Sequence, residues 1–197
     1  MSEIAGVVLA AGASRRMGTN KALLEYGGKT FLDNMCDALT AGGCRPVMAV
    51  VSRPFDEIKD RCRLQGAELV VNPDPDRGQI SSLRCAIERV RNCTGILVVT
   101  VDQGSLVAES VSQVKGALPG FDVAVARYKG QSGHPTAFSA RIFPALESPA
   151  ADQGARQVVA ECTQAKRVRF VDLDDPGVVR NLNTPDEYEA FCKTSRR

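Results

Sequence analysis

The sequence has no long hydrophobic run, no tryptophan and only one histidine, and its charges almost balance. The longest apolar stretch, Ile96–Val101, is interrupted by Thr100 and is too short to span a bilayer. Lysine and arginine number 25 against 23 aspartates and glutamates, so the net charge gives no reason to expect nucleic acid or a membrane surface as a partner. What remains is an enzyme-sized globular domain.

The cysteines also lack the patterns that would indicate a disulfide framework or a zinc site. There are seven, an odd number, and no two of them form a Cys-x-x-Cys pair. We therefore expect buried, reduced thiols. Because the first residues show no basic region followed by a long apolar stretch, a cytoplasmic location is expected.

Short apolar segments rich in β-branched residues alternate with helical patterns through the first two thirds of the chain. Strands are expected at Ile4–Leu9, Val47–Val51, Glu68–Val71, Ile96–Val101 and Val123–Ala126. Helices are expected at Thr30–Leu39, Phe55–Leu64, Ser81–Val90, Val107–Leu118, Gln153–Cys162 and Asp186–Cys192. This alternation predicts one α/β domain over residues 1–192, a doubly wound and mostly parallel sheet, with residues 193–197 as a frayed tail.

In such a sheet, ligands bind beyond the carboxyl ends of the strands. Three polar or glycine-rich segments are expected to meet there: Ala10–Lys21, Asn72–Ser81 and Asp102–Leu106. The last third is less regular, and residues 130–135 are expected to form a loop. Thr184-Pro185-Asp186-Glu187 has the pattern of a helix start, with threonine as the N-cap.

The first of these segments carries the most information. It follows a buried strand and reads Leu9-Ala-Ala-Gly-Ala-Ser-Arg-Arg-Met-Gly18, with Lys21 just beyond. Small residues allow backbone N–H groups to approach an anion, and the cations neutralise it, so the loop suits a polyphosphate. It has neither the Walker A pattern nor the dinucleotide glycine pattern. The alternative is an ordinary basic surface loop.

The string Leu-Ala-Ala-Gly-x-Ser-x-Arg-Met-Gly-x-x-Lys resembles the signature of MobA/MocA-like nucleotidyltransferases, and further blocks matching this family follow in order along the chain. The resemblance implies a Rossmann-like nucleotidyltransferase fold. It also implies a nucleotide pocket formed by the first loop and a second block: Leu9, Ala10, Ala11, Gly12, Arg15, Arg16, Lys21, Gly78, Ser81 and Ser82. In this pocket, the resemblance implies that Arg16 and Lys21 are catalytic residues that bind the triphosphate, with help from Arg15. Ser81 or Ser82 could also cap a helix.

Two residues are implied as ligands of Mg²⁺. Asp102 ends the strongest strand, where the family carries Asp-x-Pro; here the tripeptide is Asp102-Gln103-Gly104, so a glycine replaces the proline. Asn183 lies in Asn-Leu-Asn-Thr-Pro, which matches the asparagine form of a family motif. Their oxygen atoms suit this hard cation. Alternatively, Asp102 caps the following helix and Asn183 is a turn residue.

Two further matches fall on the acceptor side. Gly133-His134-Pro135 resembles a loop of the molybdenum cofactor cytidylyltransferases, and Asp152-Gln-Gly-Ala-Arg156 resembles another of their segments. The resemblance implies that His134 and Arg156 bind the acceptor. His134 is expected to bind rather than to act as a base, because a phosphate nucleophile is already anionic. Alternatively, His134 is a surface group and Arg156 decorates a helix.

The resemblance therefore implies a Mg²⁺-dependent enzyme that transfers CMP from CTP to a phosphorylated acceptor such as molybdopterin, releasing pyrophosphate, with a molybdoenzyme as a client. CTP is preferred over GTP because GTP-using relatives tend to read Leu-Ala-Gly-Gly where this chain reads Leu9-Ala10-Ala11-Gly12. Three alternatives stay open: a GTP donor, a sugar or polyol phosphate acceptor, and a non-catalytic molybdopterin-nucleotide carrier. A dehydrogenase is weaker, since no dinucleotide pattern follows the first strand.

Overall fold

A seven-stranded sheet forms the centre of the computed structural model, which describes residues 3–12, 14 and 16–194. The strands follow one another across the sheet as β5 (Glu68–Asn72), β4 (Val47–Ser52), β1 (Ile4–Leu9), β6 (Gly95–Thr100), β8 (Gln131–Ser139), β7 (Val123–Tyr128) and β9 (Val168–Asp172). β5, β4, β1 and β6 are parallel, β8 is antiparallel to both of its neighbours, and β9 is parallel to β7. The predicted α/β fold with a mostly parallel sheet is confirmed.

The strand order reverses direction at β1. From β1 the chain moves outward to β4 and then β5, and returns on the opposite side of β1 to form β6. The carboxyl ends of β1 and β6 therefore flank the switch point, where open α/β sheets bind their ligands. The loops after these two strands contain Lys21 and Asp102.

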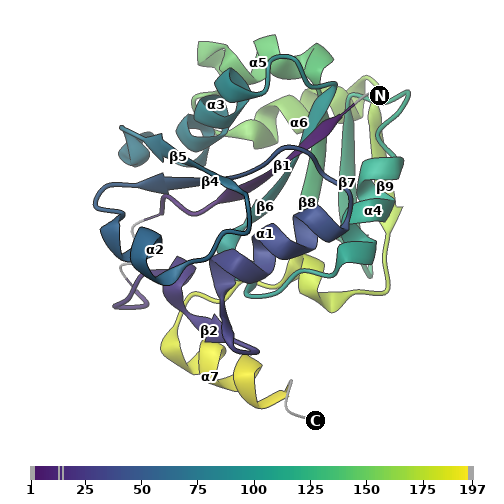
Figure 1. The fold of residues 1–197 in the computed structure, drawn as a ribbon. Helices are drawn as coiled ribbons and strands as arrows, with labels where there is room; N and C mark the ends of the chain where they lie inside the picture. Colours follow the sequence, from purple (N-terminus) through teal and green to yellow (C-terminus); the bar gives the residue numbers. More distant parts are fainter. Residues whose placement is uncertain (1–2, 13, 15, 195–197) are drawn as a thin grey trace.

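Helices cover both faces of the sheet (Figure 1). One face carries α1 (Phe31–Ala41) and α4 (Ala108–Gly116); the other carries α3 (Gln79–Arg89), α5 (Phe143–Glu147) and α6 (Ala155–Gln164). Below them in Figure 1, α7 (Pro185–Thr194) lies beside the hairpin of β2 (Glu25–Tyr26) and β3 (Lys29–Thr30). The rings of Tyr26 and Phe191 hold this pair together, with centroids 4.5 Å apart.

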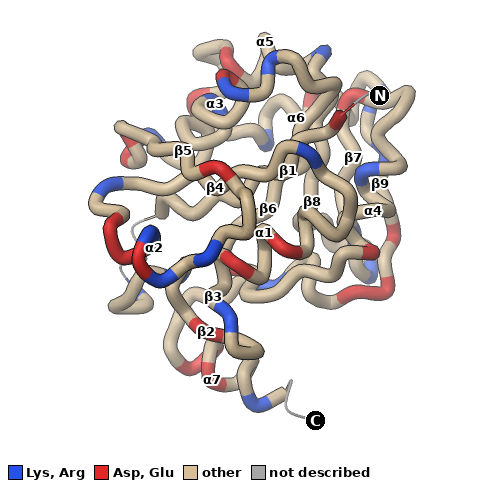
Figure 2. Tube along the Cα trace, viewed as in Figure 1, with Lys and Arg blue, Asp and Glu red and all other residues tan. Residues whose placement is uncertain are grey.

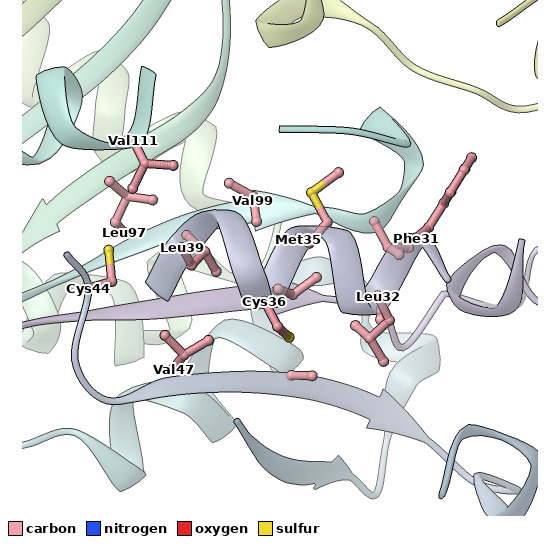
Figure 3. Close-up of a cluster of buried hydrophobic side chains, with 14 of the residues drawn as sticks. Phe31, Leu32, Met35, Cys36, Leu39, Cys44, Val47, Leu97, Val99 and Val111 are labelled. Carbon is pink, nitrogen blue, oxygen red and sulfur yellow. The ribbon is translucent and has the colours of Figure 1, made fainter. Parts of the chain in front are cut away.

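The core is divided into two clusters by the sheet. On the α1 face, the stripe expected from the sequence is confirmed: Phe31, Met35 and Leu39 are fully buried in one cluster with residues of the strands (Figure 3). Lysine and arginine are interspersed with acidic residues along the trace, as the balanced composition predicts (Figure 2). Among the described residues, no helix is both long and apolar enough to cross a bilayer. The seven cysteines are free thiols.

Most element boundaries agree with the sequence to within two residues, but α2 (Asp56–Arg61) ends earlier than expected. The reason is a turn in which Leu64 and Gln65 have φ values of 54° and 40°. The buried carboxylate of Asp33 accepts hydrogen bonds from the N–H groups of Arg63 and Leu64, at 2.9 and 2.8 Å. These bonds replace the helical ones, so the helix stops.

The prediction of a loop over residues 130–135 is wrong in part. Residues Gln131–Ser139 form β8, which pairs with β6 and β7 in the middle of the sheet. The pairing with β7 is irregular between Val125 and Arg127, opposite Gly133-His134-Pro135. The composition is loop-like because these three residues, which have poor strand propensity, form a bulge within a strand. β9 and α5 were not expected at all.

Gly133 has a packing role in this bulge. A Cβ added there would overlap the carbonyl oxygen of Val178 and lie 2.7 Å from its carbonyl carbon. We therefore predict that Gly133→Ala lowers the free energy of unfolding by about 3 kcal/mol, because rigid backbone must move. Urea unfolding followed by circular dichroism measures this, with Gly116→Ala as the control because its Cβ would meet nothing within 4 Å. Equal stability of the two variants would contradict the assignment.

Candidate active site

The loop after β1 begins as a continuation of the sheet and then turns over the switch point. The N–H of Ala10 donates to the carbonyl of Val50, and Ala10 and Ala11 are both buried. Ser14 has a φ of 47°, and its hydroxyl oxygen accepts a hydrogen bond from the N–H of Lys21 at 3.3 Å. Gly12 is exposed with open space around it, as close approach of an anion requires. Arg15 lies outside the described residues.

Lys21 points to the residues that the sequence analysis assigned to a metal. Its Nζ donates a 2.8 Å hydrogen bond to Oδ1 of Asn183 and lies 3.8 Å from Oδ2 of Asp102. Its side chain is only 12% exposed. Burial lowers the pKa of Lys21, the Asp102 carboxylate opposes that effect, and the charge of Arg16 lowers the pKa further. Arg16 itself is exposed.

Asp102 lies in a short 3-10 turn, Val101–Gln103, that follows β6. Its backbone carbonyl accepts the N–H of Leu182 at 2.7 Å, which brings the C-terminal segment to the turn. Oδ1 of its carboxylate is buried and has no hydrogen-bond partner among the described residues. A buried carboxylate oxygen without a donor is costly, and a bound cation would remove that cost.

The glycine that replaces the family proline after Asp102 fits this turn. Gly104 has a φ of 75°, which proline cannot adopt, and a Cβ there would lie 2.6 Å from Cδ1 of Leu182. The glycine in place of proline therefore gives a turn that proline could not form. The Asp102 carboxylate still lies at the switch point.

Asn183 is fixed by the start of α7, and the predicted helix start at Thr184 is confirmed. The Glu187 carboxylate accepts the N–H groups of Asn183 and Thr184, at 2.6 and 3.0 Å, and the Thr184 hydroxyl accepts the N–H of Glu187 at 3.3 Å. This is a capping box extended by one residue. The two backbone N–H bonds lower the pKa of Glu187. Asn183 is therefore both a turn residue and a side chain held beside Lys21.

The second block is organised by Asn72 at the end of β5. Its buried amide nitrogen donates to the hydroxyl oxygens of Ser81 and Ser82, at 2.8 and 2.9 Å. The interpretation of these serines as N-caps is wrong: α3 starts at Gln79, with Gly78 as the N-cap, at a φ of 81°. Ser81 donates to the Gly78 carbonyl, whereas Ser82 lines a cavity.

That cavity, of about 330 Å³, brings most of the predicted nucleotide and metal residues together. Its lining includes Leu9, Ala11, Gly12, Arg16, Lys21, Gly78, Ser82, Asp102 and Asn183. Ala10 and Ser81 do not line it. Ser14, Gln79 and Thr100 do line it and were not assigned by sequence analysis, although all three lie in or next to the segments expected at the rim.

A second cavity, of about 560 Å³, contains the residues predicted for the acceptor. His134 and Arg156 line it, together with Arg180 and Asn181, which sequence analysis missed. The two cavities share Leu9, Gln79, Thr100 and Asp102, so they adjoin at the end of β6. Asp102 is the only acidic residue among the described residues that line either of them.

His134 lies in this second cavity against the backbone of β6. Its Nδ1 lies 3.3 Å from the carbonyl oxygen of Val98. Burial lowers the pKa of His134, while the Val98 carbonyl and the Asp102 charge oppose that effect. A proton on Nδ1 then leaves Nε2 as an acceptor. Arg156 lies exposed in the first turn of α6.

The donor set suits a divalent cation that prefers oxygen ligands. It consists of one carboxylate and one amide oxygen, in a cavity that is also lined by cationic side chains. The described residues contain no cluster of three or more histidine, cysteine or acidic ligands. Mg²⁺ is commonly bound by one or two carboxylates together with substrate phosphates and water. Asp102 and Asn183 would supply the protein's part of such a set.

Comparison with known proteins identifies the family. The sequence model of one protein family, the MobA-like NTP transferase domain, matches residues 6–168. This range includes most of β1 and all of β6, the two strands at the switch point. The chain belongs to this family. It is a nucleotidyltransferase.

Relatives extend over almost the whole chain. The nicotine blue oxidoreductase of Paenarthrobacter nicotinovorans is 28% identical over 193 residues, 93% of this chain and 94% of the relative. The molybdenum cofactor guanylyltransferase of Photobacterium profundum is 28% identical over 192 residues, 95% of each. Among solved structures, Rv0371c of Mycobacterium tuberculosis has a TM-score of 0.84 at 29% identity, covering 98% of each chain. Rv0371c also has a structure in complex with manganese.

Proposed function

We propose that this MobA-like NTP transferase transfers CMP from CTP to the phosphate of a molybdopterin-type acceptor. The observation that carries the proposal is the meeting of two cavities at Asp102, with Lys21 and Asn183 beside it. A donor in the smaller cavity and an acceptor in the larger one would approach each other there. Positioning of this kind provides most of the catalysis in phosphoryl-type transfers.

In the proposed reaction, a phosphate oxygen of the acceptor attacks the α-phosphorus of CTP. The bond from that phosphorus to the bridging oxygen breaks, and pyrophosphate leaves. A divalent metal held by Asp102 and Asn183 would supply charge neutralisation at the triphosphate. Lys21 and Arg16 neutralise the remaining phosphate charge, and the backbone around Gly12 approaches it closely.

His134 and Arg156 orient the acceptor. No residue has to remove a proton, because the attacking phosphate is already ionised. The neutral imidazole of His134 accepts a hydrogen bond through Nε2, and the Arg156 guanidinium binds anionic groups. The absence of acidic residues other than Asp102 from the described lining of the acceptor cavity supports an anionic acceptor.

The lining of the larger cavity also supports a bulky acceptor with a ring system over a sugar or polyol phosphate. Its apolar part consists of Leu9, Ile80, Leu83, Val98, Val125, Phe138, Ala155, Val159, Val178 and Val179. Such a surface favours rings over hydroxyl-rich chains. The relative named molybdenum cofactor guanylyltransferase supports a molybdopterin-type compound.

We place the reaction in the cytoplasm, where free thiols stay reduced, with a molybdoenzyme as the client of the product.

Ala11 supports CTP as the donor. It is buried and lines the nucleotide cavity, and a methyl group at this position would take up space that a glycine would leave for a larger base. One methyl group in a binding pocket commonly changes specificity by about tenfold or more. A cytosine nucleotide is therefore favoured over a guanine nucleotide.

Calorimetric titration with CTP and GTP, each with Mg²⁺ and then Mn²⁺, tests the donor. We predict that wild type binds CTP about tenfold more tightly than GTP and that Ala11→Gly reduces this preference. Release of pyrophosphate on addition of molybdopterin tests the transfer. Tighter binding of GTP by wild type would reverse the donor assignment.

Two other outcomes would overturn the proposal as a whole. Binding of a molybdopterin nucleotide without pyrophosphate release from CTP or GTP would make the protein a carrier. Binding of a nicotinamide dinucleotide in place of both nucleoside triphosphates would favour a redox role, which the name of the relative from Paenarthrobacter raises. The loop after β1 argues against the latter, because Gly12 and Gly18 are too far apart for a dinucleotide turn.

A further inference from the structure

Gln103 follows Asp102 in the sequence and lines neither cavity, yet it is almost completely buried, with 1% of its surface exposed. Its amide nitrogen donates two hydrogen bonds, to the carbonyl oxygens of His134 at 3.1 Å and of Gly177 at 3.2 Å. Both acceptors are backbone atoms of segments distant in sequence. The side chain therefore joins three parts of the chain at one point.

Each of these parts contributes to the site. The turn that contains Gln103 presents Asp102, and the bulge in β8 presents His134 to the acceptor cavity. Gly177 belongs to a 3-10 turn, Pro176–Val179, from which the chain continues to Asn181 and Asn183. The Gln103 amide thus fixes the metal-side turn relative to the acceptor wall and to the segment that carries Asn183.

The glutamine amide pairs two backbone carbonyls through its nitrogen but leaves its own oxygen unpaired. Because the nitrogen faces two carbonyls, the amide oxygen points away from them, and it is buried without a partner among the described residues. A buried acceptor without a donor costs about 1–3 kcal/mol. An unbranched apolar side chain would avoid that cost, and the Gly177 carbonyl would keep its bond from the N–H of Arg180, but the His134 carbonyl would lose the donor that Gln103 supplies.

We infer that Gln103 is a positioning residue for nucleotidyl transfer, which sets the distance between Asp102 and the acceptor held by His134. This inference rests on the proposed function. Gln103 lines neither of the two cavities. It acts through the backbone of the bulge and the turn, so its loss displaces the acceptor side while the nucleotide loop after β1 stays in place.

The test is Gln103→Met, which keeps the length and removes both donors. His134 is the only histidine, so its imidazole proton resonances report on the bulge without assignment ambiguity. We expect these resonances to shift or broaden in Gln103→Met, with kcat lowered about tenfold, the Kd for CTP within about threefold, and the free energy of unfolding within about 1.5 kcal/mol of wild type. Gln113→Met, at an exposed position of α4, is the matched control.

Unchanged His134 resonances in Gln103→Met would overturn the inference, as would a turnover equal to wild type. A loss of stability with unchanged kcat for the folded fraction would also overturn it, because it would make the role purely structural. If wild type transferred neither CMP nor GMP, the proposed function would fail, while the His134 spectrum would still decide whether Gln103 holds the bulge.

Discussion

Asp102→Asn is expected to lower nucleotidyl transfer by about 10³-fold while leaving the fold intact. Asp102 is the only acidic side chain among the described residues lining the two cavities. Asparagine keeps the shape and removes the charge, so the site loses its anionic ligand and the attraction that keeps Lys21 nearby. Losses of 10²–10³ accompany the removal of a single electrostatic contact in many active sites, and this residue is expected at the upper end.

The measurement combines turnover with calorimetric titration of CTP in the presence and absence of Mg²⁺. In wild type, Mg²⁺ is expected to strengthen CTP binding; in Asp102→Asn that effect should disappear. Asp174→Asn, at an exposed position after β9, is the control for loss of a carboxylate elsewhere. Metal-dependent CTP binding that survives in Asp102→Asn would show that the metal ligands lie elsewhere.

The parts of the site that could be predicted from the sequence are those encoded locally. The strand Ile4–Leu9 and the loop that follows it are contiguous, and the residue types of a phosphate-binding turn are visible as a string. Asp102 was expected at this edge for the same reason, because it follows the apolar strand Ile96–Val101, while its assignment to a metal came from the family resemblance. The rule that ligands bind at carboxyl ends of parallel strands then brought these segments together.

Gln103 and β8 could not be found in this way, because their roles depend on contacts between distant segments. The bond from Gln103 to His134 spans 31 positions and the bond to Gly177 spans 74. The Gly-His-Pro bulge has the composition of a loop, and only its neighbours β6 and β7 make it part of a strand. Ser82 was found, but its hydrogen bond from Asn72 requires β5 to lie next to α3.

Lys21→Met is expected to have two effects of opposite sign. Turnover should fall by about 10²–10³-fold, because the triphosphate loses a cation at the phosphate-binding loop. Without nucleotide, the affinity for Mn²⁺ should instead rise by about tenfold. The Lys21 ammonium lies 2.8 Å from Asn183 Oδ1 and 3.8 Å from Asp102 Oδ2, the two oxygen ligands expected for the metal. It therefore competes with a divalent cation for the same oxygens.

The size of the second effect follows from electrostatics. Two unit charges 4 Å apart interact by about 4 kcal/mol at an effective dielectric constant of 20, and solvent reduces that here because the Lys21 and Asp102 side chains are 12% and 24% exposed. About a third of that interaction energy corresponds to a tenfold change in the affinity for Mn²⁺. Titration of the nucleotide-free protein with Mn²⁺, followed by calorimetry, measures the change, with Lys193→Met at the exposed end of α7 as the control. Weaker Mn²⁺ binding by Lys21→Met would mean that the lysine supports the metal ligands. Tighter binding would mean that the ammonium competes with the ion for these oxygens, so a triphosphate that attracts Lys21 would leave them free for the metal.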